Sequence, residues 1–236
     1  LAVVAALTRL PARPRPAAGV STAVRHAVRH ARSDPAARRL LAGIAIFTAL
    51  AAPAQELAPA VARELGAGPR GLGVLLGAMG AGALAGAWAL ERLSAAGLPR
   101  HRALPAATTL VAIAVAGLAA APAFGVAVAV MAVLGCFWIW MFAATNTAIQ
   151  LTSPRNLLGR MLGLYQLAVI APIAAGSVAV GGLAEALGIR WALAASAALL
   201  AAWGAWSLTH PVPAIDRDRR GEGQAPPATA DDAAPA

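Results

Sequence analysis

Long apolar runs separated by short polar segments dominate the chain from residue 38 onward. Six runs reach the length of ~20 residues that a helix needs to cross a bilayer. They predict transmembrane helices near residues 38–61, 70–92, 103–121, 124–149, 157–183 and 190–209. The pattern therefore predicts an all-α integral membrane protein, in which residues 38–209 form a six-transmembrane-helix bundle.

The two ends of the chain follow other patterns. Residues 1–7 are apolar but too short to cross a bilayer, and we expect residues 1–10 to be the remnant of a truncated helix. Residues 11–37 form a basic linker, in which helically spaced Val20, Val24 and Val28 predict an amphipathic helix for an anionic membrane surface. Its arginines line another face, and Asp34 before Pro35 predicts a helix N-cap. Residues 210–236 are rich in proline, glycine and mixed charge, which predicts a disordered tail.

Composition agrees with a membrane protein. Hydrophobic residues make up 59% of the chain and charged residues 12%, and the mean hydropathy is +0.68, well above the range of soluble domains. The net charge of +9 raises the alternative of a nucleic-acid partner. The arginines lie between apolar runs, however, which favours a role in membrane topology, so we expect no nucleic acid as a partner.

Charge alternates along the predicted connections. Arginines are concentrated in the linker, the second and fourth connections and the tail, whereas the first and fifth connections are balanced and the third is uncharged. Arginine-rich segments stay in the cytoplasm. The linker and the tail are therefore expected to be cytoplasmic, in a multi-pass protein of the cell (inner or plasma) membrane.

The side-chain inventory argues against an enzyme. The four histidines lie outside or at the edge of the predicted spans, and no aspartate lies within one. Ser177 has no histidine at its depth to act as a base. No glycine-rich phosphate loop is present. His26 and His30 stand at i,i+4 but lack a third ligand, so a solvated basic face is favoured over a metal site. We expect no catalytic residue, no metal and no cofactor, and the single cysteine, Cys136, excludes an intrachain disulfide.

A stripe of aromatic and polar residues is the first candidate for a substrate cavity. Trp138, Phe142, Asn146 and Gln150 step by four along one predicted span. Amide side chains in lipid need partners or water, and a cavity supplies both. The alternative is that the aromatic rings pack on neighbouring helices and Asn146 bridges two of them.

Four further residues complete this candidate surface. Tyr165 and Gln166 lie early in the fifth span. Gln55 and Glu56 lie in the first span between two prolines, which predict a bent or broken helix lining a cavity. Glu56 would there carry a proton or attract a cationic substrate. Alternatively, the span ends earlier and Glu56 is solvated near the interface.

Small residues in the second span predict close helix packing. Gly73 with Gly77, and Gly82 with Gly86, each have the GxxxG spacing that lets two helices approach in lipid. In a chain with several spans, packing inside the bundle is favoured over dimerisation.

The polar break at residues 146–166, NTAIQLTSPRNLLGRMLGLYQ, carries a family resemblance. Its Asn-Thr pair, its Gln and its Gly-Arg step resemble the loop between the tenth and eleventh helices of major facilitator superfamily exporters, in the enterobactin-exporter-like branch. The segment RHARSDPAARRLL is similar to the basic helix and Asp-Pro before the seventh helix of that branch. The segment LERLSAAGLPRHR is loosely similar to the superfamily's cytoplasmic signature at Gly86, Glu91 and Arg92.

The resemblance implies the C-terminal six-helix half of a twelve-helix transporter, completed by a missing N-terminal half. It implies export of a small-molecule substrate, of drug or siderophore type, by alternating access with ion-gradient coupling as an antiporter. Glu91, Arg92, Arg155 and Arg160 are then gate candidates, with Arg160 pairing with a carboxylate or a helix C-terminus, or serving as a topogenic charge. The alternative is a self-contained six-span channel or scaffold that acts as an oligomer in the lipid bilayer.

Overall fold

The structure is a computed structural model that describes residues 20–95 and 100–210. The predicted helix remnant at 1–10, the start of the basic linker and the predicted tail lie outside the described residues. Within the described residues all regular structure is helical. The helices are α2 (Val20–Ser33), α3 (Pro35–Ala51), α4 (Pro53–Glu56), α5 (Ala58–Glu64), α6 (Gly68–Ala95), α7 (Arg100–Ala119), α8 (Phe124–Thr152), α9 (Leu158–Leu187) and α10 (Ile189–Thr209).

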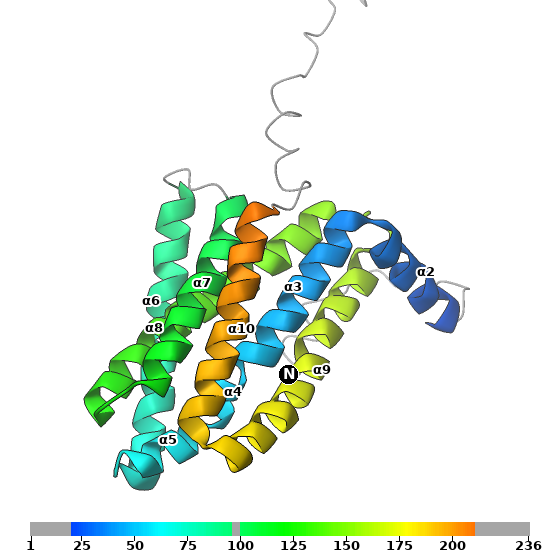
Figure 1. The fold of residues 1–236 in the computed structure, drawn as a ribbon. Helices are drawn as coiled ribbons and strands as arrows, with labels where there is room; N and C mark the ends of the chain where they lie inside the picture. The colour runs from blue at the N-terminus through cyan, green and yellow to red at the C-terminus, as the bar shows by residue number, and fades with distance from the viewer. Residues whose placement is uncertain (1–19, 96–99, 211–236) are drawn as a thin grey trace, which may run out of the picture.

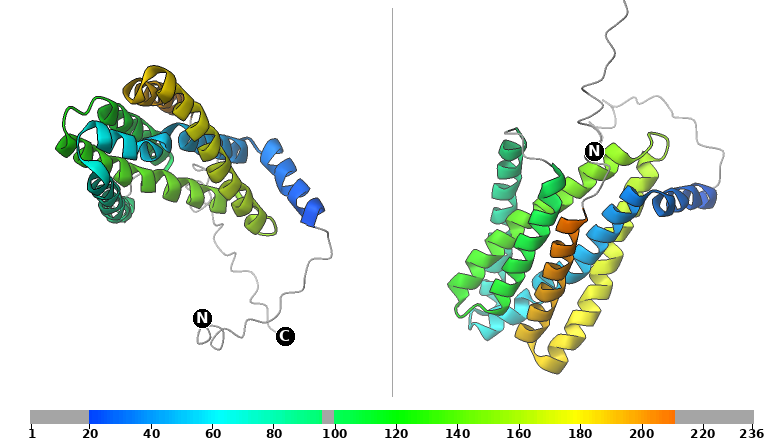
Figure 2. Two further views of the ribbon diagram at one scale, coloured as in Figure 1. Left: turned by 90° about the horizontal axis from the view of Figure 1, so that it is seen from below. Right: turned by 45° about the horizontal axis from the view of Figure 1, so that its top comes forward.

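The long helices form a bundle with two closely packed groups (Figures 1 and 2). In one group α8 packs between α6 and α7, and α7 packs in turn against α10. In the other group α3 packs along α9. Contacts of α10 with α3 and α9, and of α8 with α3 and α9, join the two groups.

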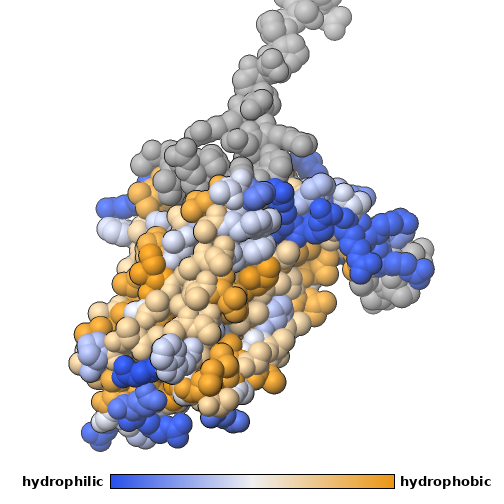
Figure 3. Space-filling model, in the orientation of Figure 1, coloured by the Kyte–Doolittle hydropathy of each residue, from blue (hydrophilic) through white to orange (hydrophobic). Residues whose placement is uncertain are grey.

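A hydrophobic belt crosses the face of the bundle seen in Figure 3, with polar residues gathered at the two ends. Five segments are long and apolar enough to cross a membrane: Pro35–Glu64, Gly68–Leu93, Phe124–Thr152, Leu158–Leu187 and Ile189–Thr209. The apolar part of α7, Leu104–Ala119, is shorter. The prediction of an all-α membrane bundle is confirmed, and a crossing by α7 stays an expectation.

The first predicted span is a broken helix, as its two prolines predict. The chain leaves α3 at Ala51 and continues through α4 and α5, with Pro53 and Pro59 near the start of each short helix. Proline has no N–H, so Pro53 cannot donate the helical bond to the carbonyl of Ala49. The α9 backbone at Gly176 packs against this same carbonyl, where any Cβ would clash with the Ala49 oxygen. The break in α3 and the closest approach of α9 therefore coincide.

A close helix crossing joins α6 to α8. A Cβ on Gly82 or Gly86 would clash with the α8 backbone, and a Cβ on Gly135 of α8 would clash with the α6 backbone at Met79. The indole N–H of Trp140, on α8, donates to the Gly86 carbonyl at 2.7 Å. Small residues thus bring the two backbones into van der Waals contact, the main source of helix association in lipid.

Only one of the two predicted GxxxG pairs packs inside the bundle. Gly82 and Gly86 face α8, but nothing lies within 4 Å of a Cβ built on Gly73 or Gly77. Within the described structure, the expectation of internal packing is wrong for Gly73 and Gly77. The motif gives the spacing of small residues and does not give the side of the helix on which a neighbour lies.

The basic linker helix α2 is attached to the bundle. Ala27 and Ala31 are buried, and α2 packs on α3 and α9, while Arg25, Arg29 and Arg32 are exposed. The Asp34 carboxylate accepts a hydrogen bond from the Ala36 N–H at 3.0 Å, with Pro35 opening α3. The predicted N-cap is confirmed, and it fixes the corner between the polar linker and the first apolar helix.

We predict that Gly82→Ala destabilises the protein by about 1–3 kcal/mol, because the added methyl group forces the α6 and α8 backbones apart. Gly77→Ala is the matched control on the same helix, since it gains the same helix propensity, up to about 1 kcal/mol, without a clash. Thermal unfolding in detergent measures both. A Gly82→Ala midpoint at or above that of Gly77→Ala would contradict the crossing.

Candidate functional site

Three aromatic rings from α3 and α8 form a cluster in the middle of the bundle. The Phe47 ring is fully buried, and its centroid lies 5.4 Å from that of Trp138 and 6.5 Å from that of Phe142. Trp138 and Phe142 stack on each other at 5.4 Å. Each such pair stabilises by about 0.5–1.5 kcal/mol beyond its buried area. These two α8 rings are half-buried, so they both pack on α3 and keep one side open.

The amide end of the predicted stripe lies near the end of α8. The Gln150 amide N–H donates to the Asn146 side-chain oxygen, so the two amides form a pair one helical turn apart. Asn146 is half-buried and Gln150 is exposed. Within the described residues, Asn146 forms no hydrogen bond to another helix. The alternative that Asn146 bridges two helices is therefore not supported by a contact in this part of the chain.

Tyr165 and Gln166 are neighbours on α9 with different environments. Tyr165 is buried and its hydroxyl donates to the Phe142 carbonyl at 3.4 Å, which joins α9 to α8 at one residue of the aromatic cluster. Gln166 is exposed. The stripe and Tyr165 therefore come together in the structure, and Tyr165 is the buried member of this group.

Gln55 and Glu56 lie in α4, at the break between α3 and α5. Gln55 is half-buried and Glu56, the last residue of α4, is exposed. They lie near one end of the bundle, whereas Asn146 and Gln150 of α8 lie near the opposite end. The structure does not bring these two groups of candidate residues together in one pocket.

The gate candidates lie at chain connections. Glu91 and Arg92 are exposed near the end of α6, and the Arg92 guanidinium lies 3.8 Å over the Trp88 ring rather than in an ion pair with Glu91. Arg155 is exposed between α8 and α9, and Arg160 is half-buried in the first turn of α9. Neither arginine forms an ion pair within residues 20–95 and 100–210. A cation at a helix N-terminus opposes the helix dipole, so helix stability does not account for Arg160.

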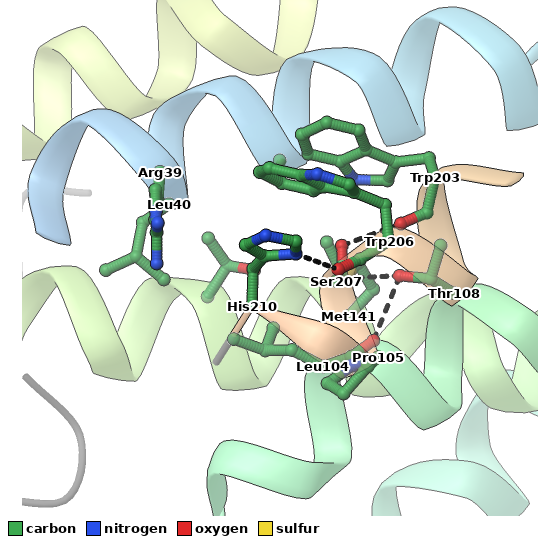
Figure 4. A pocket seen from close by; sticks show the side chains of 12 residues that line it. Arg39, Leu40, Leu104, Pro105, Thr108, Met141, Trp203, Trp206, Ser207 and His210 are labelled. Atoms are coloured by element: carbon green, nitrogen blue, oxygen red, sulfur yellow. Dashed lines mark hydrogen bonds between the residues drawn. The ribbon is translucent and has the colours of Figure 1, made fainter. Parts of the chain in front are cut away.

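A small cavity of about 60 Å³ lies among α3, α7, α8 and α10, at the end of the bundle where α10 stops (Figure 4). Stacked rings of Trp203, Trp206 and His210 form its α10 side, with neighbouring centroids 4.8 and 4.7 Å apart. The buried Thr108 hydroxyl, which also lines it, donates to the Leu104 carbonyl at 2.9 Å. Thr145 of α8 lines the cavity as well, and its buried hydroxyl has no partner in the described structure.

The sequence predictions did not include these cavity residues. Trp203 and Trp206 of α10 and His210 directly after it follow i, i+3, i+7 spacing, which is the pattern that marks one helix face. That pattern was available in the sequence. The cavity itself depends on how four helices are placed relative to one another, which no spacing along one helix reveals.

The helical bundle, its hydrophobic belt and its polar ends define a multi-pass membrane protein. The family model for transmembrane secretion effectors, within the major facilitator superfamily, matches residues 1–232. The chain therefore belongs to this transporter family. No curated protein and no solved structure matches the chain.

The Thr145 hydroxyl provides a stability test of the cavity. We predict that Thr145→Val, which has nearly the same shape, raises the free energy of unfolding by about 1 kcal/mol, because it removes a buried polar group without a partner. Thr108→Val is the matched control in the same cavity and is expected to give no gain. Thermal unfolding compares them. A loss of stability in Thr145→Val would show that its hydroxyl is hydrogen-bonded, for example to bound water.

Proposed function

We propose that the chain is the C-terminal six-helix half of a secondary active transporter that exports a small molecule of drug or siderophore type. A second six-helix half would complete it, and alternating access driven by an ion gradient would move the substrate. The family of secretion effectors supports a transport role in general. The observation that carries the more specific proposal is the open side of the α8 stripe.

This stripe has the chemistry of a binding surface for an amphipathic molecule. The stacked Trp138 and Phe142 rings offer flat apolar area that Phe47 holds rigid from behind. One turn further, the Asn146–Gln150 pair offers hydrogen-bond donors and acceptors. Binding sites for small molecules combine an apolar wall with a few placed polar groups. Three of these residues are half-buried and Gln150 is exposed, which leaves room for a substrate between this face and a second half.

The proposed orientation places the linker and the arginine-rich connections on the cytoplasmic side. The α2 helix, the connection between α8 and α9, and the end of α10 would then lie on that side together. Asn146 and Gln150 would stand at the cytoplasmic entrance of the cavity, and Glu56 would stand toward the other side. Arg160 would pair with a carboxylate or a helix C-terminus in one conformation of the transporter and release it in the other.

The Asn146–Gln150 pair gives the direct test of the proposed substrate surface. In the full-length protein, Asn146→Leu is expected to lower transport tenfold or more or to change the substrate range, since the apolar face stays and the polar anchor is lost. Thr147→Val, the next position on α8, is the matched control and should transport normally. Both variants should keep the wild-type unfolding temperature.

Normal transport by Asn146→Leu over a panel of substrates, at wild-type expression, would contradict a substrate role of this pair. A self-contained six-span oligomer would instead show no dependence on a second half, and the six-span chain alone would be active.

Glu56 is the proposed carrier of proton coupling, because it is an exposed carboxylate at the break in the first span. In proteoliposomes of the full-length protein, Glu56→Gln should bind substrate and lose the acceleration that an imposed proton gradient gives the wild type. Glu64→Gln is the control with the same charge change. Equal acceleration in Glu56→Gln and the wild type would assign the coupling to another group.

A further inference from the structure

An apolar groove of about 570 Å³ runs along the outside of the bundle between α7 and α10. Alanines of both helices make its floor, and Ala112, Ala119 and Ala197 there are almost fully buried. Ile113 of α7 and Trp191 of α10 stand up on its two sides, with 61% and 72% of their surface exposed. Among the residues that line it, only Arg190 and Trp191 carry polar side-chain atoms.

The length of the groove matches one leaflet of a bilayer. On α10 its lining runs from Arg190 to Ala201. At about 1.5 Å of rise per residue this is roughly 16 Å, or about half of the ~30 Å hydrocarbon core. The two polar side chains lie together at one end, where α10 begins, and the alanine-lined part extends from there toward the middle of the bundle.

Arg190 makes two contacts at this end and keeps unused donors. Its Nε lies 3.6 Å from the Glu64 carboxylate, and its Nη2 donates to the Ala121 carbonyl at 3.2 Å. A guanidinium carries five N–H groups in a planar fork. These two contacts leave several of them for another anion, and about half of the side chain is exposed to receive it. The Trp191 indole beside it has the amphipathic character typical of the membrane interface.

We propose that this groove binds one acyl chain of an anionic phospholipid, whose phosphate is bound by Arg190. The apolar lining fits a hydrocarbon chain and offers no hydroxyl or amide to orient a polar substrate. The cation at the interfacial end supplies the charge complementarity, and bidentate binding of phosphate is a property of the guanidinium fork.

A lipid bound here would reinforce one corner of the bundle. Arg190 already connects the start of α10 with the end of α5 and with the connection between α7 and α8. A phosphate on the same guanidinium, with its chain in the α7–α10 groove, would hold these elements together from the outside. This site lies apart from the α8 stripe, so it is independent of the proposed substrate.

The test is native mass spectrometry of the full-length protein in detergent, titrated with phosphatidylglycerol or with phosphatidylcholine of the same acyl chains. Two pairs of variants separate the contributions. Arg190→Gln removes the cation, and Glu64→Gln removes the same ion pair but keeps the guanidinium. Ala198→Leu fills the groove, and Ala205→Leu adds the same bulk at an exposed position of α10 outside it.

We expect the wild type to bind phosphatidylglycerol about tenfold more tightly than phosphatidylcholine. Arg190→Gln should abolish this preference, while Glu64→Gln should keep or increase it. Ala198→Leu should weaken binding of both lipids at least several-fold, and Ala205→Leu should not. Equal affinity of the wild type for the two lipids would overturn the phosphate contact. Unchanged binding of both lipids in Ala198→Leu would overturn the groove.

Discussion

The close approach of helix backbones at glycine is the interaction on which the rest of this bundle depends. In a bilayer the lipid tails are as apolar as leucine, so burial of apolar surface does not drive helices together. Short-range dispersion contacts between helices take the place of this hydrophobic driving force, and they require positions without a side chain. Gly82, Gly86 and Gly135 provide them between α6 and α8, and Gly176 provides them between α9 and α3. Each packed group of helices is thus organised around one such crossing.

These two crossings determine which side chains of α8 pack on neighbouring helices and which remain uncovered. With α6 held on one side by glycine and by the Trp140 bond, α8 turns Trp138 and Phe142 toward the buried Phe47 ring of α3. Tyr165 then connects the same stretch of α8 to α9. The side of the stripe that none of these neighbours covers includes Asn146 and Gln150. The packing therefore holds the Trp138 and Phe142 rings against α3 and leaves the neighbouring Asn146 and Gln150 amides partly uncovered.

The sequence predicted the elements well and the contacts poorly. Hydropathy locates the long helices because each must match the bilayer, and Pro53, Pro59 and Asp34 mark a break and a cap through local backbone chemistry. The two glycine pairs of α6 have identical spacing, yet only Gly82 and Gly86 meet a neighbour. Which face of a helix meets a neighbour depends on the rotation of that helix in the bundle. The contact of Tyr165 with α8 and the cavity beside Trp203 depend on the same rotations. Trp138 and Phe142 pack on Phe47 of α3, as one of the two interpretations expected, and a substrate cavity beside them stays a proposal.

The central claim is that the Asn146 side of α8 faces an aqueous substrate cavity in the complete protein. It is tested most directly by a water-soluble, membrane-impermeant maleimide applied to inverted membrane vesicles of the full-length protein in a Cys136→Ala background. Asn146→Cys is compared with Ala144→Cys, which is equally half-buried, at nearly the same depth and on the opposite side of α8. The account predicts that Asn146→Cys reacts, that an added transported substrate slows the reaction, and that Ala144→Cys stays unmodified. Reaction at Ala144→Cys with none at Asn146→Cys would contradict it.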